Sequence, residues 1–304
     1  MACVTDILLA TFNSERHLAA QLDSLLAQTD RDWRLLVRDA GSTDGTAAIL
    51  DSYCKRDKRI QIVSGGPASA CENFAALLAT STAPYAAFCD HDDVWFPDKL
   101  ERTLARLRAI EAESASGTPV LVFTDAIVAD DDLHEISHSF FECAKLDPTR
   151  LAPQQLAFQN VAPGCSMAFN AALREKALPI PPEAVMHDHW LMLVAASFGR
   201  VECLREPTFQ YRQHGDNVLG APKVGAGYFF RRMRQGVAAL RGRLYANVRQ
   251  AEAFVARFGD SAPPCLRALV GFEALPPLAR RRVILRHRLF KSGLLRNLGT
   301  LAIA

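Results

Sequence analysis

The first hundred residues alternate short apolar runs with amphipathic segments. The apolar runs predict strands at residues 4–10, 33–38, 60–64 and 85–89. The segments that follow them predict helices at residues 15–28, 47–56, 72–79 and 98–113. This alternation is typical of an α/β fold, with a mainly parallel sheet flanked by helices. Asp39 and Asp90 stand at the carboxyl ends of two strands, where such sheets bind ligands, so we expect them to share one crevice.

The second half of the chain is less regular. Its apolar runs predict strands at residues 120–128, 161–169 and 201–206 and a helix at residues 191–198. Pro163 and Gly164 indicate a kink or a close backbone approach in the middle strand. We interpret the three acids at 130–132 as an exposed turn, and we expect residues 211–214 to leave the core.

Three carboxylates, Asp90, Asp92 and Asp93, stand within four residues directly after the fourth apolar run. Acidic groups this close repel each other, and the usual compensation is a hard divalent cation with oxygen ligands. The aromatic pair that follows is costly to expose, so a merely solvated turn is the weaker interpretation. A cation held here would grip a diphosphate, and Asp39 would accept hydrogen bonds from a nucleobase or a ribose. The crevice therefore has the features of a nucleotide-diphosphate site.

A transferase acting at such a site also needs a base that deprotonates the incoming hydroxyl. Asp188 opens an apolar helix, where the helix dipole favours a carboxylate, so it is the candidate base. Its local sequence fits a simple helix cap equally well, and both interpretations stay open at this point. The flanking His187 and His189 are more typical of surface or structural histidines. His214 is a weak candidate for a metal ligand, and Arg212 for a diphosphate partner or a structural ion pair.

Charge is distributed unevenly along the chain. Residues 222–304 carry 16 Lys and Arg and three acids, whereas the preceding residues carry 19 bases and 30 acids. A basic helical stretch is expected at 228–258, and basic and apolar residues mixed over 280–303 predict a basic amphipathic helix. Such a helix suits an anionic membrane interface, with packing on the body of the protein as the alternative. We therefore divide the chain into a globular domain, 1–221, and a basic helical C-terminal region, 222–304.

The sequence also bears on location and excludes some enzyme classes. The eight cysteines are scattered and form no CxxC pair, which disfavours a zinc or redox site. No signal peptide and no run of about 18 uncharged apolar residues is visible, so we expect a cytoplasmic, reducing location. There is no GxxxxGK[ST] loop, and no GxGxxG follows the first strand, which disfavours a P-loop kinase or a dinucleotide dehydrogenase.

Five stretches, in the expected order, resemble motifs of a known family. They are residues 10–15, 38–46, 90–100, 187–191 and 211–218. They are similar to the turn after the first strand, the DDGSTDGT loop, the DxD motif, the HDWW segment and the YRQHxxN ending of family-2 glycosyltransferases. The bacterial rhamnosyltransferase-like group is the most similar, and the resemblance covers roughly residues 4–220.

The resemblance implies the GT-A fold, Mg²⁺ or Mn²⁺ as cofactor, and inversion at the anomeric carbon by direct displacement. On the matching positions it implies that Asp39 binds the base and that Asp90 and Asp92 serve the ribose and the metal. It makes His214 a helper of the metal or the diphosphate, and Asp188 the general base. Further substrate-binding residues implied in this way are Thr11, Asn13, Glu15, Asp93, Trp95, His187 and Arg212.

One position departs from the family pattern. Ala40 replaces the second acid of the usual pair, which leaves the donor nucleotide open between UDP and dTDP. We expect an enzyme that moves a sugar, with rhamnose as the candidate, to a saccharide hydroxyl on a membrane-anchored cell-surface glycan precursor. The nucleotide-binding half would be residues 1–115 and the acceptor half 116–221, with no nucleic-acid partner.

Two other classes of function stay open. A nucleotidyltransferase uses a similar sheet and metal, but it would need a basic, glycine-rich phosphate loop, and residues 10–17 offer only Arg16. A non-catalytic nucleotide-sugar or glycan-binding module would not need Asp90, Asp92 and Asp188 together. Release of the nucleotide with and without an acceptor distinguishes the three.

Overall fold

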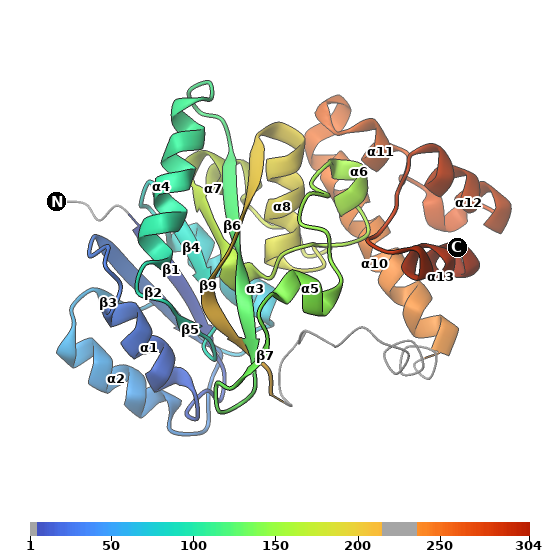
Figure 1. The fold of residues 1–304 in the computed structure, drawn as a ribbon. Coiled ribbons are helices and arrows are strands. Elements are labelled where there is room, and N and C mark those ends of the chain that lie inside the picture. The colour runs from blue at the N-terminus through green and yellow to red at the C-terminus, as the bar shows by residue number, and fades with distance from the viewer. Residues whose placement is uncertain (1–4, 215–235) are drawn as a thin grey trace.

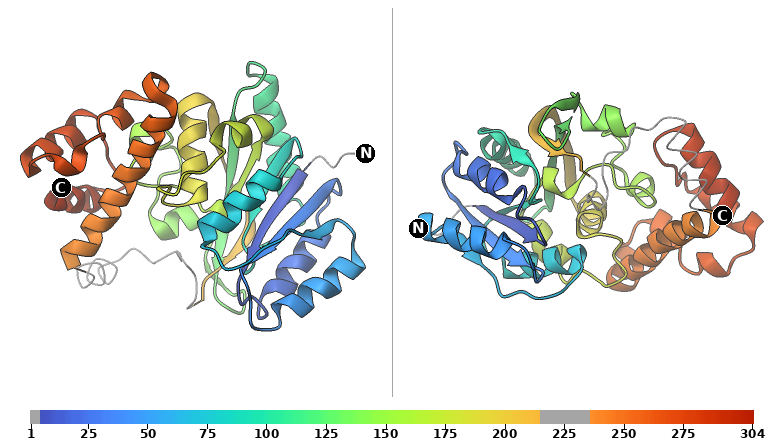
Figure 2. Two further views of the ribbon diagram at one scale, coloured as in Figure 1. Left: turned by 180° about the vertical axis from the view of Figure 1, so that it is seen from behind. Right: turned by 90° about the horizontal axis from the view of Figure 1, so that it is seen from below.

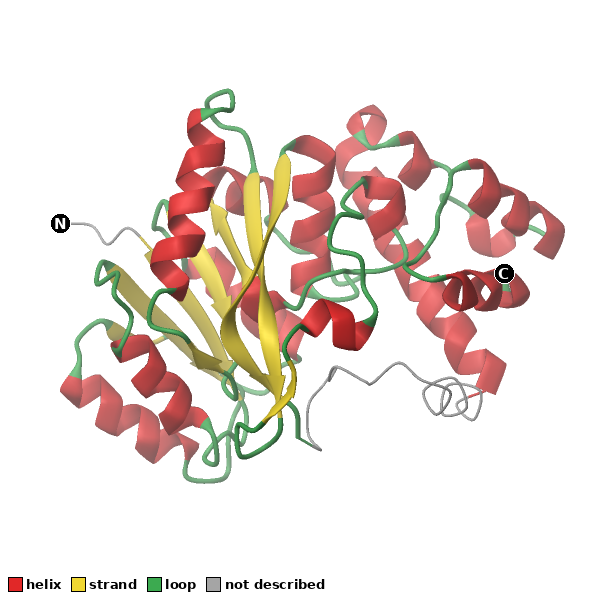
Figure 3. Cartoon of the chain, in the orientation of Figure 1, coloured by secondary structure: helices red, strands yellow, loops and turns green. Residues whose placement is uncertain are grey.

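The computed structural model describes residues 5–214 and 236–304. Nine strands form one sheet at the centre of the molecule (Figures 1 and 3). In spatial order they are β3 (Ile60–Ile62), β2 (Trp33–Asp39), β1 (Thr5–Thr11), β4 (Tyr85–Cys89), β8 (Met167–Asn170), β6 (Val120–Ala129), β9 (Arg200–Arg212) and β5 (Val94–Trp95), with β7 (Glu135–Ser137) paired to β6.

The sheet is parallel in its N-terminal half and mixed in the other half. Strand β1 runs parallel to β2 and β4, and β2 runs parallel to β3. Strand β8 is antiparallel to both β4 and β6, whereas β6 and β9 are parallel. A 3-10 turn at Gly164–Ser166 brings the chain into the sheet at the edge where β4 ends, so β8 must run against β4. The predicted α/β fold is confirmed, and its parallel part is the half that the strand–helix alternation covers.

Helices lie on both faces of the sheet (Figure 2). One face carries α1 (Leu18–Leu26) and α4 (Lys99–Ala112), with α2 (Thr46–Arg56) beside α1. The other carries α3 (Ala70–Thr80), α7 (Ala171–Ala177) and α8 (His187–Phe198). The remaining helices are α5 (Phe140–Ala144), α6 (Pro153–Leu156), α10 (Gly236–Phe258), α11 (Pro264–Arg267), α12 (Pro277–Arg286) and α13 (Leu294–Ile303).

Helix α10 packs on the body of the protein through α8. The ring of Trp190 contacts that of Phe254 on α10, with centroids 5.5 Å apart, and both side chains are wholly buried. His189 has its Nε2 2.6 Å from the Leu156 carbonyl and its Nδ1 3.3 Å from Gln250 on α10. Helix α10 is therefore part of the packed body of the protein. His189 ties α6, α8 and α10 together and is structural.

A buried carboxylate joins the start of β1 to the end of α3. Asp6 is fully buried and forms a two-point ion pair with Arg34, at 2.8 and 2.9 Å. It also accepts hydrogen bonds from Ser81 Oγ and from the N–H groups of Thr82 and Ala83. Burial raises the pKa of Asp6, but these bonds outweigh that effect and hold it below its ordinary value.

Element boundaries differ from the predictions by three residues or more in α1, β8 and β9. Helix α1 begins at Leu18 and not at residue 15, because Ser14 and Glu15 are hydrogen-bonded to the loop at residues 44–46. Strand β8 begins only at Met167, after the 3-10 turn. Strand β9 is far longer than predicted: Tyr211 and Arg212 stay in the sheet, paired with β6, so the expectation that they leave the core is wrong.

The predicted basic helix at 280–303 is two helices. Arg288 and Gly293, with φ of 52° and 89°, adopt left-handed conformations that separate α12 from α13. Of the predicted basic stretch at 228–258, residues 236–258 form α10, and residues 228–235 lie outside the described part of the chain. Within 5–214 and 236–304, no helix combines the length and the apolar character needed to cross a bilayer.

Candidate active site

Two loops at the carboxyl ends of β1 and β2 are joined by hydrogen bonds. Asn13 Oδ1 accepts from the Thr43 N–H (2.9 Å), and the Asn13 N–H donates to Ser42 Oγ (2.9 Å). Glu15 accepts from the N–H of Gly45. A Cβ on Gly45 would lie 2.7 Å from Glu15 Oε2, so only glycine fits there without a shift. The predicted binding residues Asn13 and Glu15 thus set the shape of this paired loop.

Asp39 ends β2, and the same loop surrounds its carboxylate. Its Oδ1 accepts from Thr11 Oγ1 (2.8 Å) and Ser42 Oγ (2.6 Å), and its Oδ2 accepts from the N–H groups of Gly41 (3.1 Å) and Ser42 (2.9 Å). Burial raises the pKa of Asp39, but these donors outweigh burial and hold the pKa below its ordinary value. Asp39 is therefore a fixed, charged acceptor at the sheet edge, and Thr11 orients it.

The acidic loop follows β4 at the same edge. Ligand atoms of Asp90, Asp93 and Cys165 lie within 4.8 Å of one another. Burial, and then the charge of Asp92, raise the pKa of Asp90 to about 7, and the charge of Asp188 adds to the rise. Burial, followed by the charges of Asp92 and Asp90, raises the pKa of Asp93 well above its ordinary value. The repulsion between carboxylates buried this close together is reduced when they bind protons or a cation.

Arg212, at the end of β9, binds the acidic loop through hydrogen bonds. Arg212 is 4% exposed, and its Nε donates to the Asp92 carbonyl (2.7 Å). Its backbone N–H donates to Asp93 Oδ1 (3.2 Å), and its guanidinium also donates to the Asp131 carbonyl. Arg212, predicted to bind substrate, thus supports the backbone of the acidic loop. His214 Nε2 lies 2.8 Å from Asp92 Oδ2, so the structure brings these two predicted metal ligands together.

The sequence analysis missed two residues at this place, Asp131 and His17. Asp131 was interpreted as part of an exposed turn, yet its Oδ1 lies 3.0 Å from His17 Nε2, and it also pairs with Arg16. The ring centroids of His17 and His214 are 5.0 Å apart. Burial, and then the charges of Arg212 and His214, lower the pKa of His17, so the ring is neutral. No local sequence signal marks this contact, because it joins the turn after β6 to the loop after β1.

Asp188 lies in the first turn of α8 and is 5% exposed. Met186, not Asp188, occupies the N-cap position of the helix. Asp188 Oδ1 accepts from the His189 N–H (2.6 Å). Burial raises the pKa of Asp188 to about 6, against the lowering effect of hydrogen bonds from the His189 and Gly164 backbones and the Asn160 side chain. A Cβ on Gly164 would lie 3.1 Å from His187 Nε2 and 3.3 Å from Asp188 Cβ, which is the close backbone approach that the sequence predicted.

Two of the predicted binding residues are buried among aromatic rings. The His187 ring stacks on Phe74, with centroids 4.0 Å apart, and meets the edge of Phe88 at 4.5 Å. Burial lowers its pKa to about 3, so it is neutral, and its ring nitrogens have no hydrogen-bond partner within the described residues. Trp95 is 2% exposed in β5, paired with Phe209, so its position does not support the predicted substrate contact.

The structure thus gathers the remaining predicted residues into two groups on one sheet edge. They are Thr11, Asn13, Glu15 and Asp39 in the paired loop, and Asp90, Asp92, Asp93, Arg212 and His214 in and around the acidic loop. Asp188 is near enough to the second group for its charge to act on Asp90.

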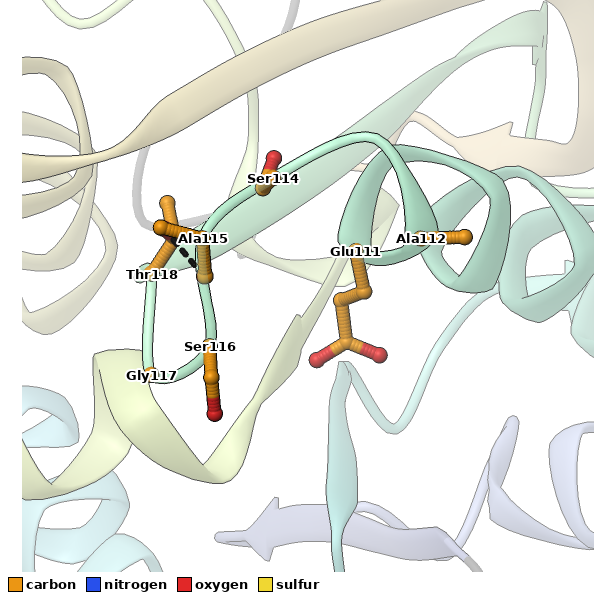
Figure 4. Close-up of a pocket in the computed structure, with 7 residues that line it drawn as sticks. All are labelled: Glu111, Ala112, Ser114, Ala115, Ser116, Gly117 and Thr118. Atoms are coloured by element: carbon orange, nitrogen blue, oxygen red, sulfur yellow. Dashed lines mark hydrogen bonds between the residues drawn. The ribbon is translucent and has the colours of Figure 1, made fainter.

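A surface hollow lies elsewhere, between the end of α4 and the start of β6 (Figure 4). Glu111 lines it and is hydrogen-bonded by Tyr85 and Asn170. The other lining residues are Ala112, Ser114, Ala115, Ser116, Gly117 and Thr118. The hollow precedes β6, whereas Asp131 of the site follows β6, so the hollow lies at the opposite end of that strand.

The residues at the acidic loop fit a hard divalent cation. Asp93 Oδ2 is buried and has no hydrogen-bond partner in the described part of the chain. Ligand oxygens of Asp90 and Asp93 lie within 4.8 Å of each other, and Asp92 Oδ2 lies 2.8 Å from Nε2 of His214. A set of carboxylate oxygens with one imidazole nitrogen suits Mg²⁺ or Mn²⁺.

The sequence is similar to known glycosyltransferases. The model of the glycosyl transferase family 2 matches residues 6–175. An uncharacterized glycosyltransferase of Nostoc sp. is 28% identical over 220 residues, which are 69% of this chain and 65% of that protein. The dTDP-rhamnosyl transferase RfbG of Shigella flexneri is 25% identical over 236 residues, 70% of this chain and 74% of RfbG. The chain thus spans less than two thirds of the Nostoc relative's length.

Two solved structures share the fold over nearly the whole chain. Staphylococcus aureus TarS, solved with UDP-GlcNAc, has a TM-score of 0.55 at 15% identity, over 98% of this chain and 90% of that one. Mannosyltransferase PcManGT from Pyrobaculum calidifontis, solved with GDP-Man and Mn²⁺, has a TM-score of 0.51 at 17% identity, over 100% and 76%. These identities show the fold alone, which is GT-A. Because the family match covers more than half of the sequence, including both strand-end loops and the acidic loop, the chain belongs to glycosyl transferase family 2.

Proposed function

We propose that this protein is an inverting, metal-dependent glycosyltransferase that moves a sugar from a nucleotide-diphosphate donor to a saccharide hydroxyl. The observation that carries the proposal is a buried carboxylate of raised pKa, Asp188, close to the acidic loop of Asp90 and Asp92. Asp188 can accept a proton, and the acidic loop can bind a diphosphate through a cation. Direct displacement needs both functions at one reacting carbon.

Asp188 would take the acceptor's hydroxyl proton as that oxygen attacks the anomeric carbon. The nucleotide diphosphate would leave from the opposite face of the sugar, so the configuration at the anomeric carbon would invert. A carboxylate with a pKa of about 6 is ionised at neutral pH and is a stronger base than an exposed aspartate. Asp90, Asp92 and His214 would hold Mg²⁺ or Mn²⁺, and that ion would supply neutralisation of the charge that develops on the diphosphate.

For the donor we propose a UDP- or dTDP-linked sugar, with rhamnose as the candidate. Asp39, fixed by Thr11 and the 41–42 backbone, is the acceptor for a nucleobase N–H. Ala40 offers no second carboxylate for the ribose. The likeness to RfbG, whose name specifies dTDP-rhamnosyl transfer, supports rhamnose, and TarS, solved with UDP-GlcNAc, supports UDP.

For the acceptor we propose a membrane-anchored glycan precursor of cell-surface polysaccharide synthesis, reached from the cytoplasmic side of the membrane. Residues 1–221 would form the catalytic domain, with the nucleotide half at 1–115 and the acceptor half at 116–221. The C-terminal region, 222–304, would place the catalytic domain near the membrane. Its excess of basic residues supports this arrangement.

A screen followed by a release assay tests the proposed activity. UDP-, dTDP- and GDP-sugars with Mn²⁺ are screened for a rise in Tm, because a ligand that binds only the native state stabilises it. Release of the nucleoside diphosphate from the selected donor is then measured with and without saccharide acceptors. A glycosyltransferase releases it faster with acceptor, a nucleotidyltransferase releases pyrophosphate from nucleoside triphosphates, and a binding module releases neither. Either of the last two results would refute the proposal.

A further inference from the structure

Helix α13 turns its apolar side toward solvent. Leu294, Leu295 and Leu298 are 74%, 59% and 53% exposed. Gly299 and Ala302, which follow on the same face of the helix, are exposed as well. A helix of a globular protein normally buries such a stripe against the core, but nothing within residues 5–214 and 236–304 covers this face.

The polar residues of α13 face the protein, together with Leu301 and Ile303. Arg296 donates to the carbonyls of Ala144 and Lys145, both at 2.7 Å, at the end of α5. Thr300 is buried, and the side chain of Asn297 bonds the backbone of Lys291. These contacts fix the helix with its exposed leucines outward, because a rotation that buried those leucines would break them.

Helix α12 also exposes apolar side chains, and it adds positive charge. Leu278 and Leu285 are 70% and 53% exposed, and Arg282 and Arg286 are exposed on the same helix at spacings of three to four residues. Arg281 donates to the Leu301 carbonyl (2.9 Å), which joins α12 to α13. The two helices lie at the outer edge of the molecule, away from the sheet (Figure 1).

The charge of this segment has one sign. Residues 274–304 contain seven Lys and Arg and no Asp or Glu. The neighbouring acid, Glu273, pairs with Arg249 at 3.2 Å. A second copy of this chain docking through the same face would set these cations against one another, which is unfavourable. An anionic lipid bilayer offers an apolar interior to the leucines and phosphates to the arginines.

We propose that the outward faces of α12 and α13 are a docking surface for an anionic lipid bilayer. Its apolar part is Leu278, Leu285, Leu294, Leu295 and Leu298, and its cationic part is Arg282 and Arg286. This deepens the proposed function, because it specifies which surface brings the catalytic domain to a membrane-anchored acceptor. Vesicle binding needs neither donor nor transfer. A failure to bind vesicles therefore counts against the docking surface alone, whereas the release assay tests the enzymatic proposal.

Co-sedimentation of the full chain with vesicles tests the surface. Phosphatidylcholine vesicles are compared with vesicles that also contain phosphatidylglycerol. The unsubstituted protein binds the anionic vesicles and not the neutral ones. The double variants Leu294→Gln/Leu298→Gln and Arg282→Gln/Arg286→Gln each lower the partition coefficient at least about tenfold.

Matched controls lie on the far side of the molecule. Ile62→Gln removes an aliphatic side chain of 52% exposure in β3, and Lys55→Gln/Arg56→Gln removes the same net charge from α2. Both controls bind within about twofold of the unsubstituted protein, and circular dichroism checks that every variant is folded. Three results overturn the proposal: no binding by the unsubstituted protein, equal losses in variants and controls, or a dimer in sedimentation velocity that the leucine variant dissociates.

Discussion

At the scale of single residues, the proposed role of Asp188 as base predicts a pH limit on the reaction. Burial raises that pKa to about 6, and only the ionised form accepts a proton. As the pH falls through that value the ionised fraction falls, so kcat decreases about tenfold for each further pH unit and is level above it. A kcat profile at saturating donor, metal and acceptor measures this. A rate that stays level down to about pH 4, the ordinary range of aspartate, would contradict the assignment.

His17 is expected to orient His214 at the proposed metal site. Its ring lies 5.0 Å from the His214 ring, and Asp131 fixes it from behind at 3.0 Å. Removing a residue that supports a ligand typically weakens metal binding about tenfold or more. His17→Ala should therefore weaken Mn²⁺ binding by about that factor, as measured by titration of the free-Mn²⁺ electron paramagnetic resonance signal.

The matched control for His17 is His134→Ala, which removes an 80% exposed ring from the turn that also contains Asp131. It should leave Mn²⁺ binding unchanged. Equal affinities for the two variants would mean that His17 has no positioning role.

The sequence placed Asp39, Asp90, Asp92 and Asp188 correctly relative to their elements, since each follows or opens a segment with clear apolar periodicity. It could not place Asp131. That role depends on where a turn after β6 meets a loop more than a hundred residues earlier, and a run of three acids is usually a solvated turn.

At the scale of elements, one glycine lets α8 return into β9. A Cβ on Gly199 would overlap the carbonyl oxygen of Pro119, just before β6. Since that atom is backbone, it cannot move aside cheaply, so Gly199→Ala should lower the free energy of unfolding by at least about 2 kcal/mol. Urea denaturation measures the change.

The control for this change is Gly242→Ala in α10, where a Cβ would meet nothing within 4 Å. There alanine should raise stability by about 0.5–1 kcal/mol, because glycine is the poorer helix former. Two variants of equal stability would contradict the steric argument.

The Asp6 ion pair is expected to stabilise the junction of β1, β2 and α3. Asp6→Asn removes the charge that pairs with Arg34 and should cost about 3 kcal/mol. Because the folded pKa of Asp6 is lowered, the stabilisation is present above pH 3.8 and is lost as the pH falls through the folded value.

Denaturation of Asp6→Asn and the unsubstituted protein at neutral and at acid pH measures that contribution. The exposed pair of Asp51 with Lys55 gives a control, since Asp51→Asn should change stability by less than about 0.5 kcal/mol. A constant difference between Asp6→Asn and the unsubstituted protein across this pH range would refute the ion-pair account.

Elements with clean periodicity were predicted to within a few residues, as β2, β4, α2 and α4 show. Strand β9 was not, because Arg205, Glu206 and Pro207 interrupt its apolar pattern, while pairing with β6 carries it on to Arg212. The break between α12 and α13 was also missed. It depends on a left-handed backbone at Arg288, which the side chain of arginine does not signal.

At the scale of the whole molecule, the parallel half of the sheet supplies the loops that we propose bind the donor, and α8, which packs on the mixed half, supplies Asp188. Strands β1, β2 and β4 bring Asp39 and the acidic loop to one edge. The antiparallel entry of β8 brings Gly164 against Asp188 at that same edge. The family motifs predicted both halves, but the geometry that joins them depends on sheet topology, which local periodicity does not contain.

The central claim is that Asp188 moves a proton while other residues hold the donor. It is tested most directly by comparing Asp188→Asn with the unsubstituted protein, using the nucleotide sugar found by the thermal screen. The account predicts that Kd for that donor with Mn²⁺, measured by calorimetry, stays within about threefold, while kcat falls at least about a hundredfold. A variant that turns over at a near-normal rate would contradict it.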